Sequence, residues 1–311
     1  MKKLIFLLLS SFAFGQDNIH SHNLENSGNF EGKIERINSF PSQFIVTRTV
    51  DVWLPKAYTA TKKYNVLYMH DGQMLFDATT TWNNQEWKVD EVASKLMEEN
   101  KVNDFIVVAI WNIPELRHMD LYPKKPYDLL SKAWKERLQD EIQKSHFPFD
   151  ATKINSDNYL KFIVEEVKPY IDKTYPVYTT PNHTAIMGSS MGGLISMYAL
   201  CEYPEVFGKA ACLSTHWVGF LDFENNPIPE SFFRYLTKNL PNPKNHSIYF
   251  DYGTATLDAS YLKYEYRVDE ILKEKGYTDS NSKNLKFEGE NHSENSWQKR
   301  IHIPMEFLFK K

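Results

Sequence analysis

The chain is 311 residues long and carries a formal net charge of −4, because lysine and arginine nearly balance aspartate and glutamate. This charge provides no electrostatic footprint for nucleic acid or for an anionic membrane surface. The ten histidines are scattered, and neither a paired-cysteine zinc spacing nor a His-Glu-x-x-His motif occurs. We therefore expect no metal and no cofactor.

The amino-terminal residues 1–15 have the composition of a secretion signal. Two lysines precede an apolar stretch, residues 4–14, that is too short to span a bilayer, and the small residues Ala13 and Gly15 precede an expected cut before Gln16. A hydrophobic amino-terminal strand is the alternative interpretation. No later stretch reaches the ~18–20 apolar residues of a transmembrane helix. We expect a protein that is periplasmic or secreted, without a membrane anchor.

Apolar runs and helical patterns alternate along the rest of the chain. Residues 33–54 alternate in polarity as two antiparallel strands do. Continuous apolar runs, typical of strands buried on both faces of a parallel sheet, occupy residues 65–69, 104–110, 184–187, 210–214 and 248–251, and a short edge strand is expected at 284–287. Helical patterns occupy residues 89–99, 159–170, 194–200, 262–275 and 296–310.

This alternation predicts an α/β protein with a mostly parallel central sheet flanked by helices and antiparallel strands at its amino-terminal end. No internal repeat, low-complexity tract or linker interrupts it, so we expect a single domain over residues 16–311. The long polar and aromatic segment 111–157, with an amphipathic stretch near 129–142, separates two sheet elements. A segment of this length inside a compact domain is usually functional.

The most informative motif is Gly188-Ser189-Ser190-Met191-Gly192-Gly193, which lies between an apolar strand and a helical pattern. Gly-x-Ser-x-Gly in this context is the nucleophile elbow of α/β-hydrolases. Gly188 and Gly192 let the helix pass close to the strand, and the Ser190 hydroxyl then projects above a helix N-terminus. The motif predicts the α/β-hydrolase fold with Ser190 as the nucleophile.

A serine nucleophile needs a base, and the base needs an acidic partner, in the chain order Ser, Asp or Glu, His. His292 lies in a polar loop between the last strand and the last helix, where an imidazole can reach the serine. His302 falls within the closing helix, His246 begins a strand, and His216 precedes every plausible acid. We therefore assign the base to His292.

The acid is expected after the strand 248–251, where three candidates follow one another. Asp251 ends the strand before a tight Tyr-Gly exit, and its side chain can simply cap that turn. Asp258 lies on a loop that can bend back over the sheet, whereas Asp269 belongs to the exposed face of a helix. The residues alone favour Asp258 over Asp251 without excluding the latter.

Two backbone N–H groups are required to stabilise the oxyanion that forms during acyl transfer. Met191 directly follows the nucleophile and supplies one of them. The second is expected from His70-Asp71-Gly72-Gln73, where Gly72 turns the chain and aims the Gln73 amide inward. An ordinary Asp-Gly turn is the alternative interpretation of this segment.

The two cysteines, Cys201 and Cys212, do not form a disulfide framework. Cys201 lies on the helix after the nucleophile, and Cys212 lies in the next apolar strand. Both are expected to be buried free thiols, although export would permit a bridge between them.

These stretches together resemble the putative-esterase family of α/β-hydrolases, which contains feruloyl and acetyl-xylan esterases, siderophore esterases, S-formylglutathione hydrolases and mycolyltransferases. The resemblance extends from about residue 45 to the carboxyl terminus. Its order and spacing are specific to the family, but no single motif is specific to one substrate. The matching segments are residues 66–73 with 75–77, 188–193, 203–208, 251–253 leading to Asp258, and 289–292 with Trp297.

The resemblance implies a triad of Ser190, Asp258 and His292, with the Gln73 and Met191 amides as the oxyanion hole. It also implies a substrate-binding rim around the site. The residues that look similarly placed on this rim are Asn112, Arg117, Tyr122, His216 and Trp217.

The leading hypothesis is a secreted serine carboxylesterase that acts on acyl or feruloyl esters of plant polysaccharide, or on related small esters. A periplasmic siderophore esterase is the second hypothesis, for which Arg117 and the pair Lys124-Lys125 would supply positive charge around an anionic ligand. Acyl transfer to a sugar is a third, because only the exclusion of water separates it from hydrolysis. A non-catalytic binding protein on a hydrolase scaffold belongs to a different class and stays open.

Overall fold

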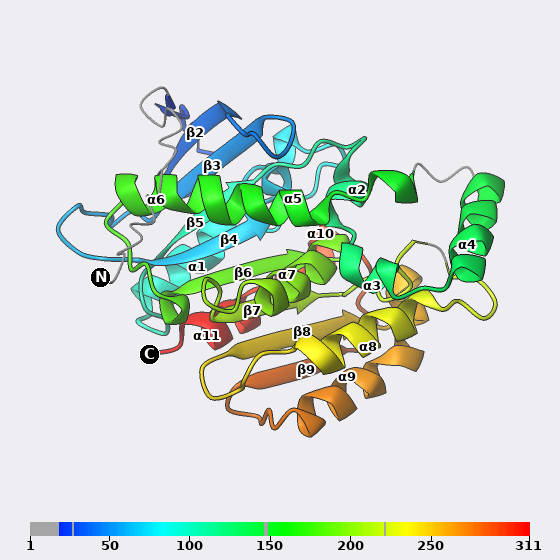
Figure 1. Ribbon diagram of the computed structural model, residues 1–311. Helices are drawn as coiled ribbons and strands as arrows, with labels where there is room; N and C mark the ends of the chain where they lie inside the picture. The colour runs from blue at the N-terminus through cyan, green and yellow to red at the C-terminus, as the bar shows by residue number, and fades with distance from the viewer. Residues whose placement is uncertain (1–18, 27, 146–148, 221) are drawn as a thin grey trace, which may run out of the picture.

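The computed structural model describes residues 19–26, 28–145, 149–220 and 222–311, and the predicted signal lies outside them (Figure 1). The described residues form one nine-stranded sheet in the order β1-β2-β3-β5-β4-β6-β7-β8-β9. The strands are β1 (His22–Asn23), β2 (Lys33–Phe40), β3 (Arg48–Leu54), β4 (Asn65–His70), β5 (Phe105–Ile110), β6 (Thr184–Ser189), β7 (Lys209–Leu213), β8 (Ser247–Gly253) and β9 (Ser282–Phe287).

The sheet is antiparallel only at its amino-terminal end, where β1 pairs with β2, β2 with β3 and β3 with β5. From β5 through β4, β6, β7 and β8 to β9 every neighbouring pair is parallel. The predicted α/β-hydrolase class, with antiparallel strands before a mostly parallel sheet, is therefore confirmed. The predicted edge strand is β9, which begins two residues earlier than expected.

The central strands are apolar throughout because helices cover both faces of the sheet. All six residues are buried in each of β4, β5 and β6. Along β4, Val66 and Tyr68 pack into one core, whereas Leu67 and Met69 pack into the other. The continuous apolar runs of the sequence thus reflect burial on both sides of each strand.

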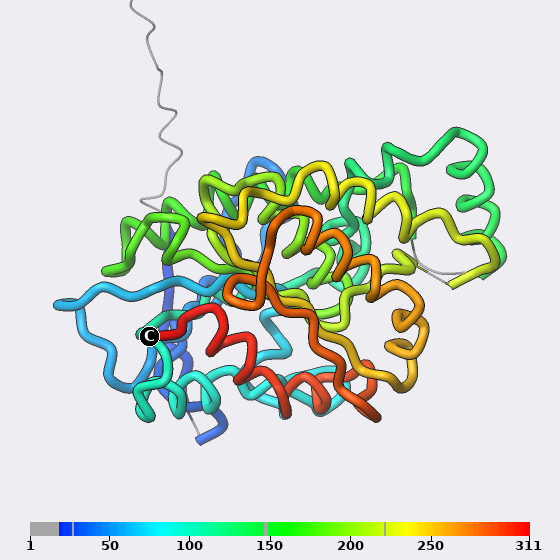
Figure 2. The backbone as a smooth tube through the Cα atoms, turned by 90° about the horizontal axis from the view of Figure 1, so that it is seen from below, coloured from blue at the N-terminus to red at the C-terminus, as the bar shows by residue number. Residues whose placement is uncertain are grey.

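The first core is covered by α5 (Ser156–Lys161), α6 (Lys168–Thr174), α7 (Met191–Glu202), α8 (Ile228–Asn239) and α9 (Leu262–Glu274). The second lies under α1 (Val89–Glu98), α10 (Glu294–Arg300) and α11 (His302–Phe309). Figure 2 shows the two layers from the edge, with α7 and α8 on one side of the sheet and α1 and α11 on the other. The closing helix predicted over 296–310 is in fact these two helices, α10 and α11.

The segment 111–157 contains the short helices α2 (Arg117–Leu121) and α3 (Lys124–Asp128) and the longer α4 (Lys132–Ser145). They stand beyond the carboxyl ends of the parallel strands (Figure 1). In α4 only Leu138 and Ile142, one turn apart, are buried, which is the apolar stripe expected of an amphipathic helix. The segment therefore covers the edge of the sheet at which α/β proteins bind their ligands.

Cys201 and Cys212 are both buried and free, as predicted. Within the described part of the chain, no helix combines the length and the apolar character needed to cross a membrane.

Asp90, in the first turn of α1, is a buried carboxyl group at a distance from the carboxyl ends of the strands. Asp90 is fully buried, and its Oδ2 accepts a hydrogen bond from the Glu31 N–H at 2.5 Å. Its Oδ1 has no partner among the described residues, and neither does Glu91 Oε2. Burial, assisted by the Glu91 carboxyl, raises the pKa of Asp90 to about 8. Asp90 therefore carries a proton in the folded protein at neutral pH.

Replacing Asp90 by Asn should increasingly stabilise the protein as the pH rises from ~4 to about 8, the range in which an unfolded Asp is ionised but the folded Asp90 keeps its proton. The wild type loses folding free energy as the pH rises through this window, and Asp90→Asn removes that loss. Thermal unfolding at several pH values should show the variant more stable by about 1 kcal/mol or more at pH ~8, with the difference vanishing near pH ~4. A variant less stable than the wild type at every pH would contradict this account.

Candidate active site

The turn between β6 and α7 holds Ser190 in a strained conformation. Its backbone has φ 57° and ψ −120°, outside the regions that a serine normally occupies. The Ser190 N–H donates to the Leu213 carbonyl at 2.9 Å, which fixes the turn against the neighbouring strand β7. Strain of this kind, about 1–3 kcal/mol, persists only where the surrounding structure enforces it, and it is concentrated at functional sites.

The close approach of α7 to β6 depends on Gly188. A Cβ at this position would lie 2.8 Å from the backbone carbonyl carbon and oxygen of Gly192, so no other residue fits without moving the helix. A Cβ on Gly192 itself would meet nothing nearer than 3.6 Å. The sequence suggests that both glycines permit the approach; the structure assigns the steric requirement to Gly188.

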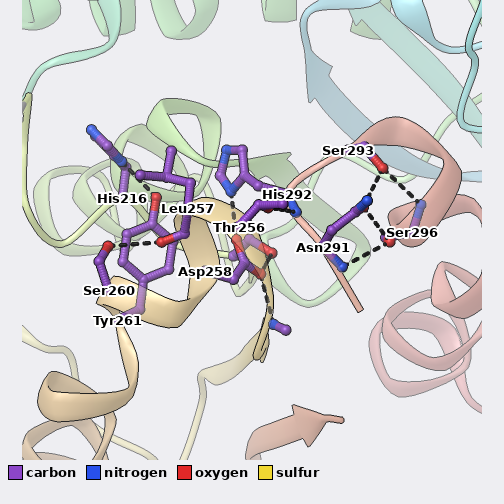
Figure 3. A network of polar contacts seen from close by, with 12 residues as sticks. His216, Thr256, Leu257, Asp258, Ser260, Tyr261, Asn291, His292, Ser293 and Ser296 are labelled. Atoms are coloured by element: carbon purple, nitrogen blue, oxygen red, sulfur yellow. Dashed lines mark hydrogen bonds and ion pairs between the residues drawn. The ribbon is translucent and has the colours of Figure 1, made fainter. Parts of the chain in front are cut away.

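Asp258 and His292 meet at the carboxyl end of β8 (Figure 3). Asp258 lies in the 3-10 helix Thr256–Ser260, and His292 lies in the loop before α10. His292 Nδ1 is 2.5 Å from Asp258 Oδ1, and the His292 N–H donates to Thr256 Oγ1 at 3.0 Å. The Asp258 side chain is fully buried, whereas the His292 side chain is 15% exposed and can be reached by a ligand.

The Asp258 carboxyl is ionised at neutral pH although it is buried. Burial alone would raise its pKa, but hydrogen bonds from His292, Ser214 and the Gly253 N–H outweigh burial and hold the pKa below its usual range. A carboxylate that accepts several such bonds favours its charged form. The charge is therefore available to orient the His292 imidazole.

The other two candidate acids do not contact His292. Asp251 is fully buried and bound by Arg300 Nη2 and by the Tyr249 hydroxyl, each at 2.9 Å. Asp269 lies on α9 and accepts from Asn284 Nδ2 at 3.1 Å. Of the three candidate acids, only Asp258 is hydrogen-bonded to a histidine among the described residues.

The remaining histidines after Ser190 are engaged elsewhere. His246 contacts the backbone carbonyls of Asn242 and Pro204, and His302 is exposed on α11. His216 is 6% exposed, with Nδ1 at 2.6 Å from the Tyr261 hydroxyl. Burial, together with the nearby His292, lowers the pKa of His216 to about 3, so its imidazole is neutral. His216 thus lies beneath the site rather than on its rim.

Tyr261 is a site residue that the sequence reasoning missed. Its hydroxyl lies 2.6 Å from His216 Nδ1, and its ring lies edge-to-face with the His292 ring, with the ring centroids 6.0 Å apart. Tyr261 therefore contacts both His216 and the histidine that pairs with Asp258 (Figure 3). No motif distinguishes it from the other aromatic residues of the stretch 261–266.

The two predicted oxyanion donors lie on adjacent segments. Gln73 belongs to the 3-10 helix Gly72–Met74 that follows β4, and Met191 begins α7. The Asp71 carboxylate beside Gln73 would lie 3.7 Å from a Cβ on Gly192, so this loop packs against the α7 N-terminus. Among the described residues, no hydrogen bond from the amide N–H of Gln73 or of Met191 is formed. Both amides are thus available to an anion.

Asn112 and Arg117 both bind Asp71. Arg117 donates two hydrogen bonds to the carboxylate at 2.8 and 2.7 Å, and Asn112 Nδ2 donates a third at 2.6 Å. Burial alone would raise the pKa of Asp71, but Arg117 and Asn112 outweigh it and the pKa is lowered. These two residues therefore hold the loop that carries Gln73 through their hydrogen bonds to Asp71.

Tyr122 and Trp217 do not lie on the rim on which the resemblance placed them, because both are fully buried. The Tyr122 ring packs against Phe149 and Phe232, with ring centroids at 5.2 and 5.5 Å. Trp217 Nε1 donates to Glu265 Oε1 at 3.0 Å. Both rings belong to the first core and pack against phenylalanines of α8, Tyr122 on Phe232 and Trp217 on Phe233.

A family model described as "Putative esterase" matches residues 44–303, which is most of the chain. The chain belongs to this family. The resemblance inferred from the motifs is therefore confirmed.

Among curated proteins, the chain is 26% identical over 240 residues to the uncharacterized protein YbbA of Bacillus subtilis, covering 75% of this chain and 80% of that protein. It is 23% identical over 189 residues to an endo-1,4-beta-xylanase/feruloyl esterase of Xylanibacter ruminicola. That match covers 59% of this chain but only 22% of the longer protein.

Solved structures share the fold. A ferulic acid esterase superposes with a TM-score of 0.61 at 18% identity, covering 90% of this chain and 98% of that one. The enterobactin esterase FES of Shigella flexneri superposes with a TM-score of 0.63 at 14% identity, covering 90% of this chain and 61% of that one. At such identities the likeness concerns the fold alone.

The elbow geometry makes a steric prediction. Gly188→Ala should destabilise the protein by about 1–3 kcal/mol or more, because its methyl group would overlap the Gly192 backbone. Gly192→Ala is the matched control, since its methyl group would make only ordinary contacts. Chemical denaturation of both variants would test this. Equal stabilities would show that the approach of α7 to β6 does not require Gly188.

Proposed function

We propose that the protein is a serine carboxylesterase in which Ser190 is the nucleophile, His292 the general base and Asp258 its acidic partner. The observation that carries this proposal is the 2.5 Å contact between His292 Nδ1 and a buried, ionised Asp258 next to a strained serine elbow. A carboxylate at Nδ1 fixes the imidazole tautomer that leaves Nε2 free to accept a proton.

The reaction follows from these positions. His292 takes the Ser190 hydroxyl proton as Oγ bonds to the ester carbonyl carbon, and the resulting oxyanion accepts hydrogen bonds from the Gln73 and Met191 amides. Collapse of this intermediate breaks the bond to the alcohol, which leaves with the proton from His292. Water then attacks the acyl-Ser190 ester by the same route and releases the acid.

As substrates we infer acyl or feruloyl esters of plant polysaccharide, or related small esters. The family supports ester hydrolysis, and a ferulic acid esterase shares the fold over nearly its whole length. The signal-like composition of residues 1–15 supports an exported enzyme that meets such substrates outside the cytoplasm.

A siderophore esterase is the second candidate, favoured by the similarity to an enterobactin esterase. An anionic catecholate ligand would require positive charge near the site. The three cations considered for this role are already paired: Arg117 with Asp71, Lys124 with Asp128, and Lys125 with Glu202. Because these cations are paired, we favour the hypothesis of polysaccharide or small esters over this one.

Steady-state hydrolysis of an ester panel by the protein from Gln16 onward tests the proposal. p-Nitrophenyl acetate, p-nitrophenyl butyrate, methyl ferulate, acetylated xylan and a catecholate tri-ester would be compared, with Ser190→Ala alongside. We expect turnover of at least one ester. In Ser190→Ala the kcat for this ester should fall by about 10³-fold or more, because the nucleophile is absent. Turnover that survives the substitution would refute the serine mechanism, and binding without turnover would favour a non-catalytic protein.

The two buried acids Asp251, within β8, and Asp258, after it, should respond differently to amide substitution. Asp258→Asn should lower kcat by about 10³- to 10⁴-fold with little loss of stability, because the amide no longer holds the required tautomer. Asp251→Asn should instead destabilise the fold by about 3–5 kcal/mol, since it leaves the buried Arg300 unpaired. Kinetics and thermal unfolding of both variants distinguish the roles. A larger loss of kcat in Asp251→Asn would reverse the assignment.

A further inference from the structure

Ser214, the residue after β7, forms hydrogen bonds with three side chains, and one of them is Asp258. Its hydroxyl is fully buried and lies 2.6 Å from Asp258 Oδ2. The same oxygen lies 2.9 Å from Trp297 Nε1 and 2.9 Å from Arg300 Nη2. No part of this network belongs to the nucleophile, the base or the oxyanion hole.

The direction of each hydrogen bond follows from the number of protons available. An indole N–H and a guanidinium N–H can only donate, so Trp297 and Arg300 occupy both lone pairs of Ser214 Oγ. The hydroxyl has one proton, and the remaining neighbour, Asp258 Oδ2, can only accept it. The Ser214 hydroxyl therefore has a single orientation, directed at the carboxylate.

The Asp258 carboxylate is held by this donor and by the backbone. Oδ2 accepts from Ser214 and from the Gly253 N–H, both at 2.6 Å, which leaves Oδ1 for His292. Two donors on one oxygen define the plane of the carboxylate as well as its position. The remaining oxygen consequently faces Nδ1 of the imidazole.

Arg300 anchors the hydroxyl from the far side. The same Nη2 that donates to Ser214 also binds Asp251 Oδ1 at 2.9 Å, and Asp251 accepts from Tyr249. The titratable groups around Asp258 are thus His292 and Tyr261 on one side, with Arg300 and Asp251 behind Ser214. A rigid, buried ion pair fixes the orientation of a neutral hydroxyl.

We propose that Ser214 is a positioning residue that orients Asp258 toward His292 through a hydroxyl whose direction is set by Trp297 and Arg300. This inference rests on the triad proposed above and adds a residue that acts on its acid. Loss of the hydroxyl leaves Asp258 with one fewer donor and frees the carboxylate to rotate about the Gly253 contact. The loss should therefore appear in the chemical step rather than in substrate binding.

The backbone at Ser214 provides a matched pair of variants. Its φ is 42°, in the left-handed region, where glycine is unstrained but serine and alanine are both strained. Ser214→Ala removes the hydroxyl and keeps the strain, whereas Ser214→Gly removes both. Thr215→Val is the control for loss of a buried hydroxyl, because Thr215 Oγ1 donates to the Cys212 carbonyl and not to Asp258.

We expect kcat to fall about 10- to 100-fold in both Ser214 variants, as it does when a catalytic group is slightly misplaced, while KM changes little. The acid limb of the kcat/KM profile should also move to higher pH in both. The Ser214 hydrogen bond lowers the pKa of Asp258, so without it the Asp258–His292 pair takes up a proton more readily. Thr215→Val should leave kcat and this limb unchanged.

Wild-type kcat in Ser214→Gly, or a loss of kcat without movement of the acid limb, would overturn the positioning role. A loss in Ser214→Ala that Ser214→Gly restores would show that kcat does not depend on the hydroxyl, because both variants lack it. If instead the wild-type activity survives Ser190→Ala, the proposed triad itself is wrong. The two failures are therefore distinguishable.

Discussion

The site depends on a carboxylate that is completely removed from water. An unpaired buried charge of this kind destabilises a protein by several kcal/mol, so Asp258 can stay ionised only where donors surround it. Those donors come from three separate segments: Gly253 ends β8, Ser214 follows β7, and His292 precedes α10. Solvating this one charge thus requires segments almost eighty residues apart in sequence to converge at a single point.

The parallel sheet supplies that convergence without special loops. β4, β6, β7 and β8 are neighbours in the sheet and point the same way, so their carboxyl ends share one edge. Asp71 follows β4, Ser190 follows β6, Ser214 follows β7 and Gly253 ends β8. Each strand therefore delivers one component to the site. Helices on both faces then leave this edge as the place where a polar group can remain reachable.

Sequence reasoning succeeded where the determinant is local. The elbow at Ser190 is encoded by glycine spacing, and the buried strands by continuous apolar runs. The residues alone favoured Asp258 without excluding Asp251, because the two acids lie close together along the chain and only their distant partners, His292 and Arg300, separate their roles. The burial of Tyr122 and Trp217 likewise depends on packing against the distant helix α8, which local spacing does not record.

The buried Asp251–Arg300 pair is best understood through geometry rather than stability. Burying such a pair contributes little net stability, because desolvation offsets the attraction between the charges. An apolar pair of equal volume would fill the same space. It would, however, leave one lone pair of the Ser214 oxygen unoccupied, and the hydroxyl could then turn away from Asp258. The Asp251–Arg300 pair therefore restricts the proton of the Ser214 hydroxyl to one direction, toward the Asp258 carboxylate.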